Sequence, residues 1–165
     1  MKKVAIFAVA VALLTGTAMA SSIAVPWFVD NAAVASGLPP AAGITSILYL
    51  KNNTTEDIEA TIQYFTSTGV PMGPFAPGEN TFSITALASI GARLVEDDSS
   101  QEASPGGRDV PNRPRTGVAG DAEFKKNGSA IVQWVGAPSD IQGQLTTWQA
   151  GGIGYAHLLP AGAAS

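Results

Sequence analysis

The sequence predicts an all-β fold, a single antiparallel β-sandwich that follows a cleaved signal peptide. Three observations support this prediction. Apolar and polar residues alternate with a period of two in several short segments, which is typical of half-buried strands. Turn-forming Gly, Pro, Asn and Asp residues separate these segments. After the leader, no segment of about 11 residues or more shows the helical spacing of apolar side chains.

Residues 1–20 have the three parts of a secretory signal peptide. A Lys-Lys leader is followed by an unbroken apolar run from Val4 to Leu14 and by a small-x-small triplet that ends at Ala20. The run is too short to span a bilayer of roughly 30 Å, so we expect cleavage after Ala20 rather than anchoring in the membrane. Residues 21–165 would then form one domain.

Charge and cysteine content exclude several classes of function. Without the two leader lysines the chain has seven basic and thirteen acidic side chains, a net charge of −6. An acidic chain gains nothing from counterion release on DNA or RNA, so we expect no nucleic-acid partner. The absence of cysteine excludes thiol nucleophiles and thiolate metal sites. No second apolar run is long enough for a transmembrane helix, so we expect a chain that does not span a membrane.

The first half of the chain contains three predicted strands. Ile23–Val29 is apolar but contains Pro26, which cannot donate to a ladder, so we expect an edge strand or an irregular first strand. Ile44–Leu50 is apolar at nearly every position, as in a strand covered on both faces, and an Asn-Asn-Thr-Thr turn follows it. Ile58–Phe65 alternates cleanly, which indicates a half-buried antiparallel strand.

Further strands and a long polar loop follow. Thr81–Ala88 predicts a strand with one apolar face, and Ile90–Val95 extends or continues it. Residues 96–128 are nearly all polar, Gly or Pro, which leaves too few apolar side chains to offset the ordering entropy. We therefore expect a mobile or loosely held loop that proteases cut first at its arginines. Its apolar anchors are Val110, Val118 and Phe124.

The segment from Gly128 to Trp148 is the best-specified piece of the predicted fold. Ala130, Val132 and Trp134 lie on one side of an extended chain, and the period of two resumes after a turn-like break at residues 136–140. With its β-branched and aromatic residues, this pattern predicts a β-hairpin that has Trp134 in the core.

The end of the chain contains the only histidine. Ile153–Leu159 predicts the last strand, and residues 161–165 predict a loose tail. His157 would share a face with Ile153 and Tyr155, which indicates a packed or rim side chain rather than a metal ligand or a catalytic base. Because a Gly-x-Ser-x-Gly elbow is also missing, we expect no enzyme, no cofactor and no metal site.

Three segments carry a resemblance to a known group of proteins. They are YLKNNTTEDIEATIQYFTSTG, APGENTFSITALASIGARLVEDD, and GSAIVQWVGAPSDIQGQL followed by YAHLLPAG. Together they resemble an uncharacterised group of exported bacterial proteins with Ig-like β-sandwich modules, and the likeness covers most of Ile44 to Gly162. It implies an Ig-like sandwich and an exported location, periplasmic, secreted or at the cell surface, and it implies no activity.

The first candidate site is the N-terminal strand. This strand is apolar enough to need burial, and the sheet edge of a neighbouring subunit could accept it by strand addition. We therefore favour a non-enzymatic structural or interaction module of the bacterial cell surface, assembling with itself or with another surface protein. The candidate assembly residues are Ile23, Val25, Trp27, Phe28 and Val29.

The alternative is a module that binds a carbohydrate or another ligand. Trp148 lies in phase with Gln142 and Gln144 on the polar face of the predicted hairpin. An aromatic ring beside side-chain amides suits a sugar ring, but the exterior of any β-sandwich has the same pattern. Both functions therefore stay open.

The long loop contains charges of opposite sign. Asp97 and Asp98 belong to an acidic cluster, and Arg108, Arg113 and Arg115 lie downstream of it. These groups could clasp the loop to itself or to a sheet edge, or they could meet the opposite patch of another subunit. The acidic cluster could supply oxygen ligands to a cation, but it lacks the spacing of a calcium-binding loop, so a solvated acidic loop is expected.

Overall fold

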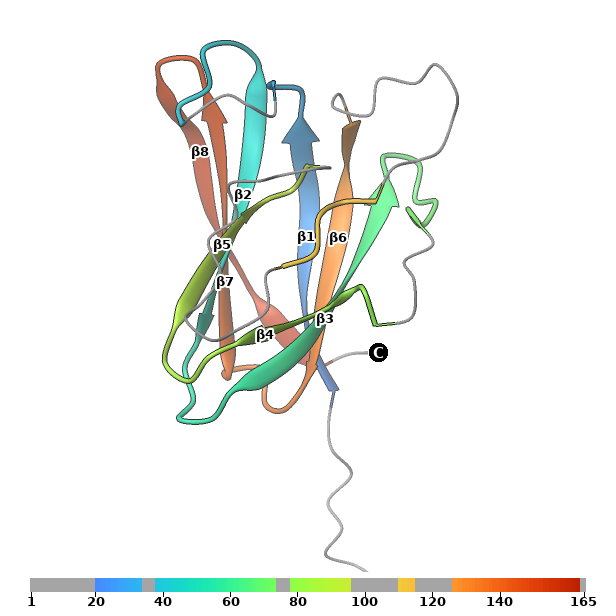
Figure 1. The fold of residues 1–165 in the computed structure, drawn as a ribbon, viewed down its shortest axis with the longest axis vertical. Helices are drawn as coiled ribbons and strands as arrows, with labels where there is room; N and C mark the ends of the chain where they lie inside the picture. Colours follow the sequence, from blue (N-terminus) through green and yellow to red (C-terminus); the bar gives the residue numbers. More distant parts are fainter. Residues whose placement is uncertain (1–19, 34–37, 74–77, 96–109, 115–125, 164–165) are drawn as a thin grey trace, which may run out of the picture.

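Nine β-strands and no helix form the part of the chain that the computed structural model describes, residues 20–33, 38–73, 78–95, 110–114 and 126–163 (Figure 1). The all-β fold class is therefore confirmed. In chain order the strands are β1 (Ala20–Asp30), β2 (Ile44–Asn52), β3 (Ile58–Thr66), β4 (Thr81–Ile84), β5 (Ser89–Arg93), β6 (Lys126–Val135), β7 (Ile141–Gln149), β8 (Gly152–Leu159) and β9 (Ala161–Ala163).

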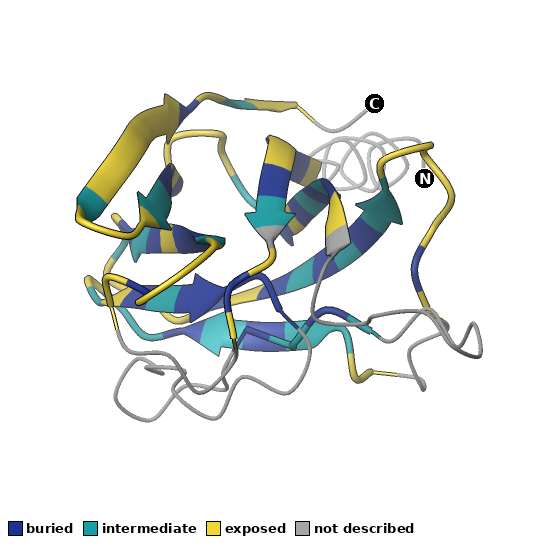
Figure 2. Cartoon of the chain, turned by 90° about the horizontal axis from the view of Figure 1, so that it is seen from above, coloured by how far each residue is buried: buried dark blue, intermediate teal, exposed yellow. Residues whose placement is uncertain are grey.

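The strands form two antiparallel sheets that enclose one core (Figure 2). The first sheet has the order β4-β3-β6-β1-β9, and the second has the order β5-β2-β7-β8. One residue pair, Asp30 with Thr45, connects the two sheets through β1 and β2. Each sheet turns its apolar face inward, as two packed layers must to remove those faces from water.

β6 and β7 belong to different sheets, so the predicted hairpin is wrong. β6 pairs with β3 and β1, whereas β7 pairs with β2 and β8. The predicted core position of Trp134 is confirmed, since its side chain is 3% exposed. A strand has the same period of two whether its neighbour in sequence lies beside it or across the core, so the pattern could not distinguish the two.

The crossing between β6 and β7 is fixed by hydrogen bonds to groups of residues 136–140. The Asp140 carboxylate accepts a hydrogen bond from the Ala137 amide at 2.7 Å, and Trp134 Nε1 donates to the Ala137 carbonyl at 3.1 Å. Gly136 has a φ of 147°, which residues with a side chain rarely adopt. The segment is therefore an arch between the sheets rather than the turn of a hairpin.

A second crossing separates β4 from β5, where the sequence predicted one extended strand. β4 pairs with β3 in the first sheet, and β5 pairs with β2 in the second. Leu87 lies between them with a φ of 59°, and its amide donates to the Thr54 carbonyl at 3.0 Å. The segment predicted as one strand thus contributes to both sheets.

Asn52 links the two sheets at this end of the sandwich. Its side chain is fully buried, and Nδ2 donates to the carbonyl of Ile84, the last residue of β4, at 3.0 Å and to that of Glu56 at 2.8 Å. Oδ1 accepts from the Thr54 amide at 2.8 Å, so the predicted turn after β2 is present. Because Asn52 is the last residue of β2, its side-chain amide joins β2 of the second sheet to β4 of the first sheet.

β1 belongs to the first sheet. It pairs with β6 along its length, with β9 through Ser21–Ile23 and with β2 at Asp30. Between these contacts, Ala24–Val29 has one described neighbouring strand, so the expected edge position is confirmed for those residues. The alternative expectation, an irregular strand, is confirmed as well, because the register with β6 shifts between Val25 and Phe28, around Pro26. Residues 161–163, predicted as a loose tail, form β9 instead.

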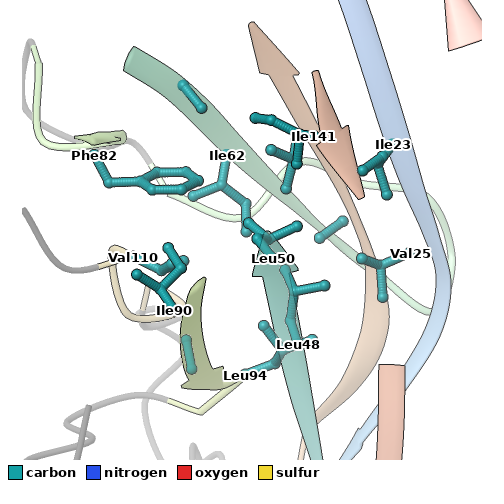
Figure 3. Close-up of a cluster of buried hydrophobic side chains, with 14 of the residues drawn as sticks. Ile23, Val25, Leu48, Leu50, Ile62, Phe82, Ile90, Leu94, Val110 and Ile141 are labelled. Atoms are coloured by element: carbon teal, nitrogen blue, oxygen red, sulfur yellow. The ribbon is translucent and has the colours of Figure 1, made fainter. Parts of the chain in front are cut away.

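The core contains side chains from both sheets and from the long loop (Figure 3). Figure 3 shows Leu50 of β2 near Ile62 of β3, Leu48 next to Leu94, and Val110 beside Ile90. Val110 is buried, as its role as an anchor requires, so the expectation of a loosely held loop is wrong for residues 110–114. The other two expected anchors lie outside the described residues.

We predict that two adjacent residues of β1 differ strongly in their effect on stability. Phe28 is fully buried and packs edge-on against the Tyr64 ring at 6.1 Å between centroids, whereas Trp27 is 47% exposed. Phe28→Ala should lower the free energy of unfolding by about 3–5 kcal/mol, and Trp27→Ala by about 1 kcal/mol or less. Urea unfolding of both variants measures this, and equal losses would contradict the placement of β1.

Candidate functional site

The N-terminal strand is built into the fold of its own chain. Ile23, Val25 and Phe28 are fully buried, and the Val29 amide donates to Ser46 Oγ at 3.0 Å. Of the five candidate assembly residues, Trp27 is the one with a largely exposed side chain. Removal of residues 21–30 would therefore open the core rather than leave a folded domain. The sequence could not show this, because an apolar strand that needs a partner does not specify whose sheet it joins.

The second sheet ends at β8, and no described strand pairs with the other side of it. β8 has eight residues, whereas the outer strands β4, β5 and β9 have four, five and three. No Asp, Glu, Lys or Arg occurs between Gly152 and Ala163. Long, uncharged edges of this kind are templates for a further strand. The exposed large apolar side chains of β8 are Ile153, Tyr155 and Leu158.

A bulge at Gly154 decides which face each β8 side chain takes. Thr147 pairs with Tyr155, but Trp148 pairs with Ile153, so one extra residue lies in β8. Ile153 is therefore on the outer face, and the prediction that it shares a face with Tyr155 and His157 is wrong. His157 is exposed and stacks on Tyr155, with ring centroids 6.0 Å apart and planes 13° apart.

A groove of about 300 Å³ crosses the outer face of the second sheet. One wall is the cross-strand row Tyr49, Gln144 and Leu158, and the other is the row Ser89, Lys51 and Gln142. Leu50 and Gly143, which pair between the rows, also line it. Gln142 and Gln144, two of the predicted ligand-face residues, thus lie in one groove.

Trp148, the third predicted ligand-face residue, does not line the groove. Its ring is half-buried, and its Nε1 is buried with no hydrogen-bond acceptor among the described residues. The aromatic ring in the groove is that of Tyr49, which is 36% exposed. Tyr49 was not predicted as a site residue because it lies in an apolar segment, Ile44–Leu50, that predicts a strand covered on both faces. Its spacing of two from Lys51 was the signal that this face is exposed.

Arg113 is buried between Tyr64 of β3 and Val95, the residue two positions after β5. Its side chain is 1% exposed, and its amide donates to the Val95 carbonyl at 3.0 Å. Nearby, the Tyr64 hydroxyl donates to the Pro111 carbonyl at 2.8 Å. The expectation that proteases cut at Arg113 first is therefore wrong. The remaining candidate loop contacts, Asp97, Asp98, Arg108 and Arg115, lie outside the described residues.

Burial controls the ionisation of Tyr64. It raises the pKa of the Tyr64 hydroxyl far above its ordinary value of 10.0, and the positive charge of Arg113 lowers it in part. The phenol is therefore neutral and available as the hydrogen-bond donor to the Pro111 carbonyl. This bond fastens the segment 110–114 to β3.

Neither a metal centre nor a membrane-spanning helix is found in the described part of the chain. No three His, Asp or Glu side chains there lie close enough to hold a metal ion. None of the described residues belongs to a helix long and apolar enough to cross a membrane. In comparisons with known proteins, no protein-family model, no curated protein and no solved structure matches the chain.

We predict that Tyr64 makes the protein less stable at alkaline pH. Its folded-state pKa is raised above 10.0, so its contribution to stability is complete below that pH and is lost as the pH rises towards the raised value. For the wild type this amounts to about 1.4 kcal/mol between about pH 9 and pH 11. Urea unfolding at both pH values should show a smaller loss in Tyr64→Phe. An equal loss in the two proteins would show that another group titrates.

Proposed function

We propose that the protein is an exported, non-enzymatic interaction module that binds a second copy of itself through β8. The free edge of β8 carries this proposal. Backbone N–H and C=O groups on that side have no described partner strand, and the side chains beside them include three exposed apolar residues. Such an edge binds another extended strand through main-chain hydrogen bonds.

A second copy is the favoured partner because the β8 edge is complementary to itself. Antiparallel pairing about a two-fold axis would join two four-stranded sheets into one continuous sheet of eight strands. If Ala156 lies on the axis, Tyr155 of one copy is opposite His157 of the other, so the stacked rings of both copies meet. Without the leader the chain has a net charge of −6, but β8 contains no Asp, Glu, Lys or Arg, so like charges do not meet there.

The other outer strands are less suited to pairing. β4 and β9 are short, and short edges give few main-chain hydrogen bonds. β5 ends at Arg93, whose buried guanidinium donates to Thr45 Oγ1 at 3.4 Å and to the Ala33 carbonyl at 3.4 Å. We therefore propose assembly through β8 in place of the assembly through β1 that the sequence suggested.

Export and the kinship with Ig-like modules are parts of the same proposal. The basic leader, the apolar run and the triplet ending at Ala20 support a cleaved signal peptide, and β1 begins at that residue. Cleavage would place the module in the periplasm, at the cell surface or outside the cell. The two packed antiparallel sheets support the Ig-like kinship.

We predict that a charge in the middle of β8 dissociates the dimer. The exported protein should be a dimer at high concentration and a monomer on dilution, as measured by size-exclusion chromatography with light scattering. Ala156→Lys brings two like charges together at the axis and should raise the dissociation constant about tenfold or more. Ala137→Lys adds the same charge at an exposed position on the arch and is the matched control.

Three results would contradict this proposal. The wild type could remain monomeric at every concentration, Ala156→Lys could leave the dimer unchanged, or Ala137→Lys could dissociate it equally. Circular dichroism and thermal unfolding of both variants establish that each is folded.

A further inference from the structure

Four of the five polar side chains that line the groove on the second sheet have no hydrogen-bond partner among the described residues. In the described part of the chain, the side-chain amides of Gln142 and Gln144 and the side-chain hydroxyls of Tyr49 and Ser89 take part in no hydrogen bond. On the first sheet, by contrast, Gln63 Nε2 donates to the carbonyls of Tyr64 and Met72 at 2.9 and 3.1 Å. The groove thus collects free donors and acceptors on one face.

The Tyr49 ring is held at one end of this groove by its neighbour on β5. Tyr49 pairs with Gly91, and a Cβ added at Gly91 would lie only 3.0 Å from Tyr49 Cε1. The ring therefore occupies space that a side chain on β5 would need. It rests against the backbone of β5 while staying 36% exposed, so it is a supported apolar surface that a ligand can contact.

The charges around the groove disfavour an ionic ligand. None of the described residues that line it is a carboxylate, so a metal ion would find no anionic oxygen ligand there. Among the same residues Lys51 is the one cation, and its ammonium already donates to the Asn52 carbonyl at 2.9 Å and to the Leu87 carbonyl. An anion would therefore have to compete with two carbonyl oxygens for this group.

The amides, hydroxyls and aromatic ring that line the groove suit a neutral ligand rich in hydroxyl groups. Amide and hydroxyl side chains both donate and accept hydrogen bonds, as sugar hydroxyls do. The face of an aromatic ring carries partial negative charge and attracts the C–H groups of a sugar ring. A volume of about 300 Å³ is at the small end of the range for ligand sites, which suits one or two sugar units.

We infer that the groove is a binding site for a short neutral saccharide, with Tyr49 as the stacking platform and Gln142, Gln144 and Ser89 as hydrogen-bonding groups. The site is separate from the free edge of β8 except for Leu158, which belongs to both. Because the groove is partly open to solvent, we expect weak binding, with a dissociation constant of about 0.1–10 mM.

Titration followed by ¹⁵N NMR tests this inference on the intact exported protein. The probes are cellobiose, maltose and di-N-acetylchitobiose, each added to about 50 mM, which exceeds the expected dissociation constant. At least one should shift the side-chain amide signals of Gln142 and Gln144 to saturation. Tyr49→Ala and Gln144→Ala should each weaken that binding about tenfold, because each removes a contact to the ligand.

Gln133→Ala is the matched control, since it removes an exposed glutamine from β6 on the other sheet. It should leave the dissociation constant unchanged. The inference is overturned if none of the three sugars shifts these signals, or if both groove variants bind as tightly as the wild type. Tighter binding of galacturonic acid than of any neutral probe would also overturn it, because the ligand would then be an anion.

Discussion

Mutual burial of the two inner sheet faces is the constraint on which the rest of the structure depends. Neither sheet can remove its apolar face from water alone. Strands that follow one another in the sequence rarely share a sheet. Among the described strands, β3 with β4 and β7 with β8 are the consecutive pairs that lie in one sheet, and β1 contacts β2 through the single pair Asp30 and Thr45. Every other connection passes from one sheet to the other, so each half of the chain contributes strands to both layers.

The crossings are held together at one end of the sandwich. The Asn53 amide donates to the Asp140 carbonyl at 2.8 Å, and Asn53 Nδ2 donates to the Ser139 carbonyl at 3.0 Å. Ser21 Oγ donates to the Gly136 carbonyl at 2.6 Å, which attaches the start of β1 to the same arch. Because β2 ends and β7 begins at these connections, the alignment of the two strands is fixed. That alignment places the two rows of side chains that make the groove.

The local features of the fold were predictable, and the long-range ones were not. Alternation located most strands and the buried Trp134, since a half-buried strand imposes its own pattern. It could not identify strand partners, so β6 and β7 were predicted as a hairpin, and the pairing of β1 with β9 was not predicted. Burial of Arg113 depends on Val95 and Tyr64, which are remote in sequence and leave no local signal. The bulge at Gly154 likewise reversed the face of Ile153.

The candidate sites follow from the same distinction. Gln142 and Gln144 were identified from their alternation, but their companion Tyr49 comes from β2, which pairs with β7 only in the folded protein. The free edge of β8 is a property of the whole sheet, because a strand becomes an edge only when its partners are known. Both sites lie on the second sheet. The proposed function depends on the free edge of β8, through which two copies of the chain would pair.

Amide hydrogen exchange along β8 tests that claim most directly. Alternate amides of an edge strand point away from its one neighbour, so they are protected only if a further strand binds. We expect slow exchange of these β8 amides in concentrated protein and fast exchange after dilution, with no such change in β4. Fast exchange of the outward-pointing β8 amides at every concentration would contradict it.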